Sequence, residues 1–299
     1  MKNKSKSLIK RTPAEKIFSV FNYIFMVAIM IVMVYPLWLV LVASFSDAVE
    51  LSGHSGLLFK PLGFSTDAYR LMIKNPMILK GYGNTLFLVV VGLAVNMTLT
   101  CMGAYFLSRK NVLLNKPITI MIIFTMYFSG GMIPTYMTVM ELGLKNNLLS
   151  LILPGAVNTF NLIILRTSFA SVPDALEESA RLDGASHWRI MLQIVLPLSK
   201  ASLSVIALYY AVQHWNSWFN AMLYLDDREL FPLQLVLREI LIQNDTSSMT
   251  QMVDVGDSSF IGETIKYAVI IVSVVPILCI YPFIQKYFEK GVMIGAVKG

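Results

Sequence analysis

Charged side chains are scarce in this sequence of 299 residues: Asp, Glu, Lys and Arg together make up 14% of it, against about 25% in a typical soluble domain. Hydrophobic residues make up 56%. This balance excludes an ordinary soluble domain and indicates a membrane protein, for which a helical bundle in lipid would form one unit.

Cysteine and histidine are also rare. Cys101 and Cys279 both lie inside apolar runs, so we interpret them as small apolar residues rather than as a disulfide or a metal site. The three His, at positions 54, 187 and 214, are scattered. The sequence has no G-x-x-x-x-G-K-[ST] phosphate loop, no G-x-S-x-G elbow and no H-E-x-x-H pair. It therefore offers no catalytic residues and no metal ligands, and we expect no cofactor in this chain.

Apolar runs of about 20 residues, the length of a helix that crosses a bilayer, occur six times. They cover residues 18–44, 85–107, 118–139, 148–169, 201–224 and 264–287. The third and fourth contain SGGMIP and LPGAVN, where Gly and Pro predict broken or kinked helices. The first run is too long for a signal peptide, so we expect it to remain as an anchor. These runs predict an all-α membrane protein with six transmembrane helices.

The distribution of Lys and Arg predicts the orientation. If the N-terminus is cytoplasmic, most of the 24 basic residues fall in cytoplasmic segments, as the positive-inside rule requires. The basic residues behind the net charge of +6 would then lie next to anionic lipid, which argues against a nucleic-acid-binding protein. We expect a cytoplasmic segment 1–17, a six-helix transmembrane domain 18–288 and a cytoplasmic tail 289–299. Within the domain, 177–199 would be a cytoplasmic loop and 225–262 an external one.

The cytoplasmic loop 177–199, EESARLDGASHWRIMLQIVLPLS, predicts two short helices. Pro173 and the acidic residues after it favour a helix start, Gly184 favours a sharp turn, and Pro197 marks the return to the membrane. Two sets of side chains are spaced to share a face: Ala175, Ser179 and Leu182 in the first helix, and Trp188, Met191, Leu192 and Val195 in the second. Such a pair could dock into a groove on a cytoplasmic partner or lie on the lipid surface.

Polar side chains gather in the fifth apolar run. Tyr209, Gln213, Asn216 and Asn220 are spaced to form the polar face of one helix, with Trp215, Trp218 and Phe219 alongside. Polar groups at bilayer depth usually face the bundle interior or a pathway. We interpret the cluster as the lining of a solute pathway, although each residue alone could serve interhelical hydrogen bonds or an aromatic belt. Further candidates are Asn158, Asn161 and Tyr127, whereas Asn96 suits a packing contact.

The cytoplasmic loop resembles the EAA loop of ABC importer permeases, whose pattern is Glu-Ala-Ala, three residues, Gly, nine residues and Ile-x-Leu-Pro. The matching positions are Glu178, Ser179, Ala180, Gly184, Ile194, Leu196 and Pro197. Ser179 stands where the pattern has its first Ala, so one small residue replaces another. The ending EKGVMIGAVKG resembles the tail of the maltose-type, MalG-like carbohydrate permeases. DRELFPLQLVLREIL, residues 227–241, resembles the external loop of the LplC-like subgroup, which is associated with complex oligosaccharides.

The resemblance implies the type I ABC importer permease fold and a set of partners. These are a second, homologous permease subunit, two ATPase subunits that bind ATP and Mg, an extracellular lipid-anchored solute-binding protein, membrane lipid and a carbohydrate, in a bacterial cell membrane. Glu178 would contact a basic residue of the ATPase, and Gly184 would set the angle between the two short helices. Asp183, Ala185 and Trp188 would belong to the same docking surface. ATP would then drive alternating access through this loop.

Two alternatives remain open. A secondary transporter or channel would predict internal repeats and ionisable residues within the spans, and the sequence has no clear repeat and few acids there. An ABC permease for a non-sugar solute, such as a peptide, would share the loop but not the carbohydrate-type tail.

Overall fold

The computed structural model describes residues 12–110, 112–242, 262 and 264–279. Their secondary structure is helical, apart from one antiparallel bridge between Ser46 and Phe64. The chain forms two compact units. The first comprises residues 1–70 and 250–271, and the second residues 71–249 and 272–299. An all-α chain is as the sequence predicts.

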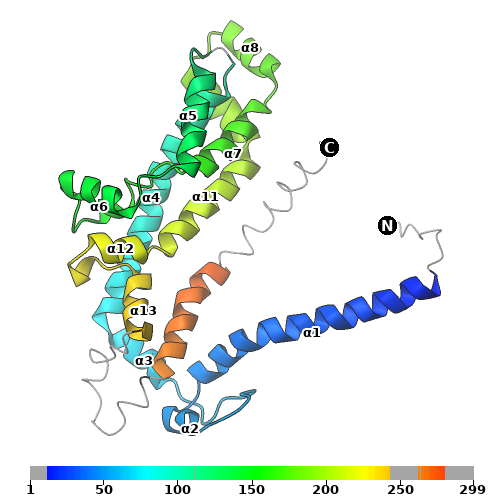
Figure 1. The fold of residues 1–299 in the computed structure, drawn as a ribbon, viewed down its shortest axis with the longest axis vertical. Coiled ribbons are helices and arrows are strands. Elements are labelled where there is room, and N and C mark those ends of the chain that lie inside the picture. Colours follow the sequence, from blue (N-terminus) through cyan, green and yellow to red (C-terminus); the bar gives the residue numbers. More distant parts are fainter. Residues whose placement is uncertain (1–11, 111, 243–261, 263, 280–299) are drawn as a thin grey trace. The chain divides into compact units, whose positions relative to one another are not determined.

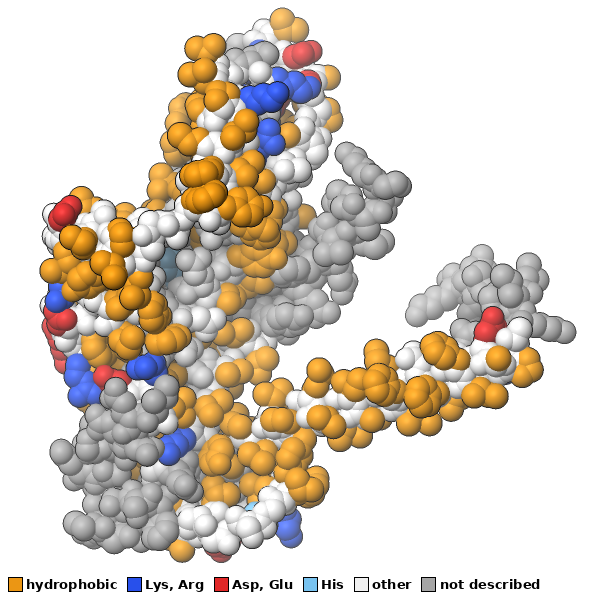
Figure 2. Space-filling model, viewed as in Figure 1, with side chains coloured by type: hydrophobic (Ala, Val, Ile, Leu, Met, Phe, Trp, Pro, Cys, Tyr) orange, Lys and Arg blue, Asp and Glu red, His pale blue; other side chains and the backbone are white. Residues whose placement is uncertain are grey.

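The first unit is dominated by α1, Pro13–Ser44 (Figure 1). Thr12 and Glu15 form a reciprocal capping box at its start, and Pro13 occupies the first helical position, where its missing N–H costs nothing. Apolar side chains cover the length of α1 (Figure 2), yet only its last three residues are buried. An exposed apolar helix of this length suits a lipid environment. The predicted first helix is confirmed.

A small core closes the end of α1. Val42, Ala43 and Leu58 are buried together, and Leu51 and Tyr267 pack against them. The short helix α2, Ala48–Ser52, starts at Asp47, whose carboxylate accepts hydrogen bonds from the backbone N–H groups of Val49 and Glu50. Helix α3, Asp67–Lys74, follows. These elements lead the chain into the second unit.

Helix α4, Pro76–Ser108, is the central element of the second unit. It packs against α7, Thr159–Ala170, α11, Lys200–Trp215, and α13, Leu233–Ile242 (Figure 1). Gly92 allows the approach of α11, because a Cβ added there would lie closer than 3.0 Å to the imidazole of His214. The predicted second helix is confirmed and extends beyond 85–107 at both ends.

Several apolar runs form broken helices. The third run forms α5, Asn115–Tyr127, and α6, Met132–Glu141, which are bent by 112°. The fourth run forms the 3₁₀ turn η1, Leu148–Leu151, and then α7. Both breaks occur where the sequence predicts them. The fifth run, expected as one helix, divides into α11 and α12, Phe219–Tyr224.

Two of the described helices, α1 and α4, are each long and apolar enough to cross a membrane. Counting each bent pair as one span raises this number to four. The helix Thr264–Cys279 covers the first part of the sixth run. The rest of that run, the tail 289–299 and residues 243–261 of the predicted external loop lie outside the described residues, so six spans remain a prediction.

Candidate functional site

The loop 177–199, which the sequence predicts to be cytoplasmic, folds as two short helices around Gly184. Helix α8, Asp174–Leu182, ends in a paired hydrogen-bond motif: the N–H of Ala185 donates to the carbonyl of Ala180 at 2.9 Å, and the N–H of Gly184 donates to that of Arg181 at 3.0 Å. Gly184 has φ +77°, a left-handed conformation that costs other residues about 1–2 kcal/mol. Helix α9, His187–Ile190, follows at once. The predicted helix, glycine turn and helix are confirmed.

A π-helical turn, Met191–Val195, extends α9, and the short α10, Leu196–Leu198, completes this arm. The arm His187–Leu198 meets α11 at a bend of 88°. Pro197 lies in α10, two residues before the bend at Ser199. Its ring and its missing N–H disfavour a continuous helix, which favours a bend at this point. The loop therefore re-enters the bundle where the sequence predicts.

The apolar side chains of the arm divide between two faces. Met191 and Val195 are buried with Ile190 in a core shared with α4 and α7, whereas Trp188 is 57% exposed and Leu192 is 56% exposed. Trp188 and Met191 line one cleft, as a shared apolar face predicts, but the four side chains differ in burial. A π-helical turn holds more residues than an α-helical one, so the ideal helical spacing does not apply from Met191 to Val195.

The remaining residues of the EAA pattern occupy different positions around the turn. Ala180, Ala185, Ile194 and Leu196 pack partly against the core. The exposed members are Glu178, Ser179, Asp183, Gly184 and Pro197. Leu182 is 90% exposed, and Ala175 lies with Ser179 on the exposed side of α8. The loop therefore presents charged, small and apolar side chains together around one glycine turn.

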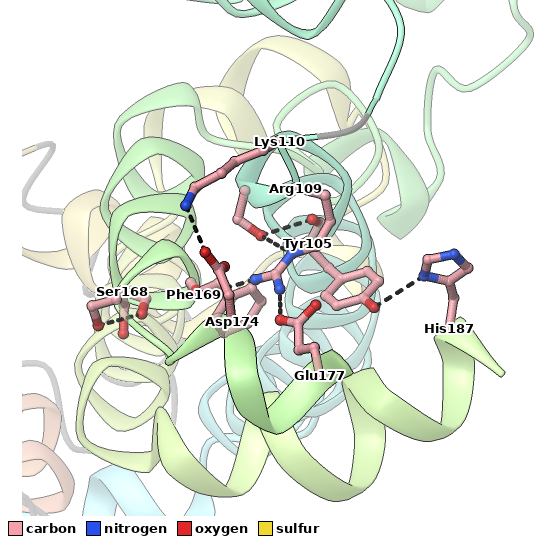
Figure 3. Close-up of polar contacts among 10 residues, drawn as sticks. Tyr105, Arg109, Lys110, Ser168, Phe169, Asp174, Glu177 and His187 are labelled. Carbon is pink, nitrogen blue, oxygen red and sulfur yellow. Dashed lines mark hydrogen bonds and ion pairs between the residues drawn. The ribbon is translucent and has the colours of Figure 1, made fainter. Parts of the chain in front are cut away.

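A buried ion pair ties this loop to α4 (Figure 3). The Glu177 carboxylate contacts the guanidinium of Arg109, and both side chains are nearly inaccessible. Arg109 Nη2 also donates to the carbonyl oxygen of Phe169 at 2.9 Å, and its Nε donates to Ser108 Oγ at 3.0 Å. The guanidinium lies over the Tyr105 ring at 4.9 Å. Burial lowers the pKa of Arg109, but an arginine stays charged.

Two further contacts flank the buried pair (Figure 3). Lys110 Nζ donates to Asp174 Oδ2 at 2.6 Å, which lowers the pKa of that exposed carboxyl group. The Tyr105 hydroxyl and His187 Nδ1 lie 3.3 Å apart. The start of α8, its middle and the start of α9 are therefore each held by the end of α4. The loop and the end of α4 are therefore joined at three places.

Arg109 and Glu177 were missed from the sequence, which drew attention to Glu178 instead. Asp174 and Glu177 lie three residues apart and so share a helix face, opposite the basic pair Arg109 and Lys110 in the fold. That spacing was the available signal. Without the packing of α4 on α8, nothing relates the two pairs.

A cleft of about 380 Å³ opens beside this network. Its apolar wall includes Tyr105, Trp188 and Met191, and its polar rim includes Arg181 and His187. Figure 2 shows basic and acidic side chains gathered around α8. The cleft places an apolar recess directly next to the exposed side of the glycine turn.

The second set of candidates lies on α11 and α12. Tyr209 and Gln213 belong to α11, Asn216 follows its last residue, and Asn220 belongs to α12. All four are exposed. The prediction of one continuous helix was wrong, because the N–H of Trp218 turns back to the carbonyl of Asn216 at 2.9 Å. The four side chains still lie on exposed surface of the isolated chain.

The aromatic candidates diverge. Trp215 is buried, and its Nε1 donates to the carbonyl of Ser273 at 3.3 Å. Trp218 is 38% exposed. Its ring stands edge-on to Phe219 with centroids 5.5 Å apart and lies 4.9 Å from the guanidinium carbon of Arg238. Of these three rings, those of Trp218 and Phe219 are exposed and that of Trp215 is buried.

Among the further polar candidates, the side chains of Asn158 and Asn96 have local partners. Asn158 caps α7, since its Oδ1 accepts from the N–H of Asn161 at 3.1 Å. Asn161 is buried, whereas Tyr127 is 78% exposed. Asn96 is buried and donates to the carbonyl of Gly155 at 3.3 Å, as expected of a packing contact. These contacts account for Asn158 and Asn96 without a solute.

Two relatives from Bacillus subtilis (strain 168) match nearly the whole chain. The permease protein YtcP of a polygalacturonan/rhamnogalacturonan transport system is 42% identical over 286 residues, which cover 95% of this chain and 99% of the relative. Protein LplC is 41% identical over 289 residues, with coverage of 96% and 97%. The first of these relatives is, by its name, a transport system permease, as the sequence resemblance implies.

A solved structure shows the same fold. A bacterial ABC transporter involved in the import of the acidic polysaccharide alginate contains a chain that matches with a TM-score of 0.87 and 28% identity, covering 94% of this chain and 99% of that one. The family model of the binding-protein-dependent transport system inner membrane component matches residues 100–294, which include the glycine turn and the polar surface. This chain belongs to that family: it is a multi-pass permease subunit of a binding-protein-dependent ABC importer.

Proposed function

We propose that this chain is one of two permease subunits in an ATP-driven importer of oligosaccharides. Its six helices cross the bacterial cell membrane with both termini in the cytoplasm. The second permease is a homologous chain, two ATPase subunits bind ATP and Mg, and a lipid-anchored binding protein delivers the solute from outside. This chain itself needs no cofactor. The names of the relatives, which concern polygalacturonan, rhamnogalacturonan and alginate, support a carbohydrate solute.

The observation that carries the proposal is the attachment of the glycine turn to α4. The loop combines an exposed carboxylate at Glu178, exposed apolar side chains at Leu182 and Trp188, and a buried pair that fixes α8 to α4. Exposed apolar groups beside charges are typical of a docking surface. A conformational change of an ATPase bound to this surface would move α4 and the helices that pack on α4.

The solute would follow the exposed surface of α11 and α12. Sugars combine apolar ring faces with many hydroxyl groups, which suit the exposed ring of Trp218 and the amides of Gln213, Asn216 and Asn220. The second permease subunit would cover this surface and complete the pathway. Such a shared lining explains why polar side chains stay exposed in the isolated chain.

Docking is tested by co-purification of the tagged permease pair with its ATPase. We expect Glu178→Lys and Gly184→Pro to lower the amount of bound ATPase about tenfold or more. The first reverses a charge at the proposed contact, and the second forces φ at Gly184 to about −65° where the turn needs +77°. Bound ATPase is measured by its activity and by gel quantification.

A matched control is Glu141→Lys, which reverses the charge of an exposed carboxylate at the end of α6. We expect full ATPase retention in this variant. Equal retention in all four proteins would remove the docking role from the loop. If no ATPase binds the folded wild type, the importer mechanism itself fails and a secondary transporter is favoured.

A further inference from the structure

Helix α13 places an arginine against an exposed aromatic ring of the proposed pathway. The guanidinium carbon of Arg238 lies 4.9 Å from the centroid of the Trp218 ring. Trp218 remains 38% exposed and its neighbour Phe219 remains 43% exposed. Cation–π contacts of this kind hold a guanidinium in place while leaving its N–H groups available. The ring and the cation therefore face a solute together.

The position of Arg238 is fixed by the packing of α13 on α4. Leu233, Val236 and Leu237 are buried. The N–H of Leu233 donates to Thr85 Oγ1 at 2.9 Å, and the side-chain amide of Asn84 donates to the carbonyl of Phe231 at 3.1 Å. A side chain on such a rigid helix needs little further ordering on binding, which favours affinity.

The acidic side chains near α13 pair with cations other than Arg238. Three acids of this region have cationic partners: Glu239 pairs with Arg228 at 2.7 Å, Asp226 pairs with Lys145 at 2.9 Å, and Glu229 pairs with Lys80. By contrast, Arg238 has no ion pair within 4.0 Å and no hydrogen bond to any residue that the structure describes. Its positive charge and its donors are therefore available to an anionic ligand.

We propose that Trp218 and Arg238 form a subsite for a sugar unit that carries a carboxylate. This inference rests on the proposed function and narrows its solute to uronate-containing oligosaccharides. The exposed part of the indole would pack against the apolar face of the sugar ring. The guanidinium would donate two parallel N–H···O bonds to the carboxylate, a geometry that lysine cannot reproduce. The amides of Asn216 and Asn220 would meet neutral hydroxyl groups.

The test measures binding to the full complex in nanodiscs, without the binding protein. The probes are trigalacturonate and its fully methyl-esterified form, which has the same rings but no charge. We expect Arg238→Gln to weaken trigalacturonate binding about tenfold, equivalent to about 1.4 kcal/mol, and to change methyl-ester binding less than about twofold. Arg238→Lys should fall between Arg238→Gln and wild type.

The control is Lys74→Gln, which removes one positive charge from an exposed side chain of α3 and should leave both affinities unchanged. Equal losses for both sugars in Arg238→Gln would assign a structural role and overturn the proposal, as would no loss. Wild type that binds the ester as tightly as the acid would also overturn it. ATP-driven uptake by wild type with its binding protein is measured separately: uptake of neutral oligosaccharides alone refutes this subsite, whereas uptake of no oligosaccharide refutes the proposed function.

Discussion

Glu177→Ala is expected to lower the free energy of unfolding of the permease by about 3–5 kcal/mol. The substitution leaves the guanidinium of Arg109 buried beside α8 without its counter-charge. Its remaining partners, the Phe169 carbonyl and Ser108 Oγ, are neutral and compensate only in part. Thermal unfolding of the complex in nanodiscs measures the loss.

The exposed pair Lys110–Asp174 is the matched control, because it links the same two elements in contact with water. Asp174→Ala should cost at most about 1 kcal/mol. The double variant Arg109→Met/Glu177→Leu should recover most of the stability lost in Glu177→Ala, since it leaves no buried charge unpaired. If Glu177→Ala costs no more than Asp174→Ala, the pair is not buried in the folded protein.

The same variants separate stability from coupling. If the buried pair transmits motion from the loop to α4, Glu177→Ala should keep binding-protein-stimulated ATP hydrolysis above half of the wild-type rate while solute uptake per ATP falls severalfold. Both quantities are measured in proteoliposomes below the unfolding temperature of the variant. A parallel decline of hydrolysis and uptake would instead mean that the pair only stabilises the fold.

Gly92→Leu is expected to disrupt the packing of α4 on α11. Even the Cβ of an alanine at this position would lie closer than 3.0 Å to the ring of His214, which is buried. Relieving this overlap requires the buried His214 ring to move or the two helices to separate, and overpacking of this kind costs about 1–3 kcal/mol, with leucine at the upper end or beyond. We expect a lower unfolding temperature for Gly92→Ala and little folded protein for Gly92→Leu.

Gly83→Ala provides the control within the same helix. A Cβ there meets no other atom within 4 Å, and alanine favours the helix by up to about 1 kcal/mol, so its stability should equal or exceed that of wild type. Adding His214→Ala to Gly92→Ala should restore part of the loss, because it removes the ring that the new Cβ meets. Equal effects of Gly83→Ala and Gly92→Ala would contradict the close approach.

Local patterns were sufficient for the loop 177–199 and for several helices. Gly184 predicts the turn because a left-handed residue is nearly free of strain only for glycine. The apolar lengths of 18–44 and 85–107 predict α1 and α4, and SGGMIP predicts the break between α5 and α6. Each of these signals lies within a few neighbouring residues, where sterics and hydropathy dominate.

The helix faces were harder to predict. Ideal helical spacing puts Trp188 and Val195 together, but a π-helical turn intervenes, and Trp188 is exposed whereas Val195 is buried. The same spacing makes one helix of Tyr209 to Asn220, but the chain turns after Trp215. A change of less than one residue per turn rotates every later side chain, so small backbone adjustments that suit neighbouring helices override the local pattern.

The sequence by itself determined the family, the membrane setting and the position of the glycine turn, because composition, apolar run length and the spacing of the EAA pattern are properties of short segments. Which charged side chains contact each other, or an aromatic ring, follows only from the tertiary structure. Arg109 reaches Glu177 across 68 positions of the chain, and Arg238 reaches Trp218 through the docking of α13 on α4. Contacts between distant segments depend on how helices pack, and packing is a property of the whole bundle rather than of any single stretch.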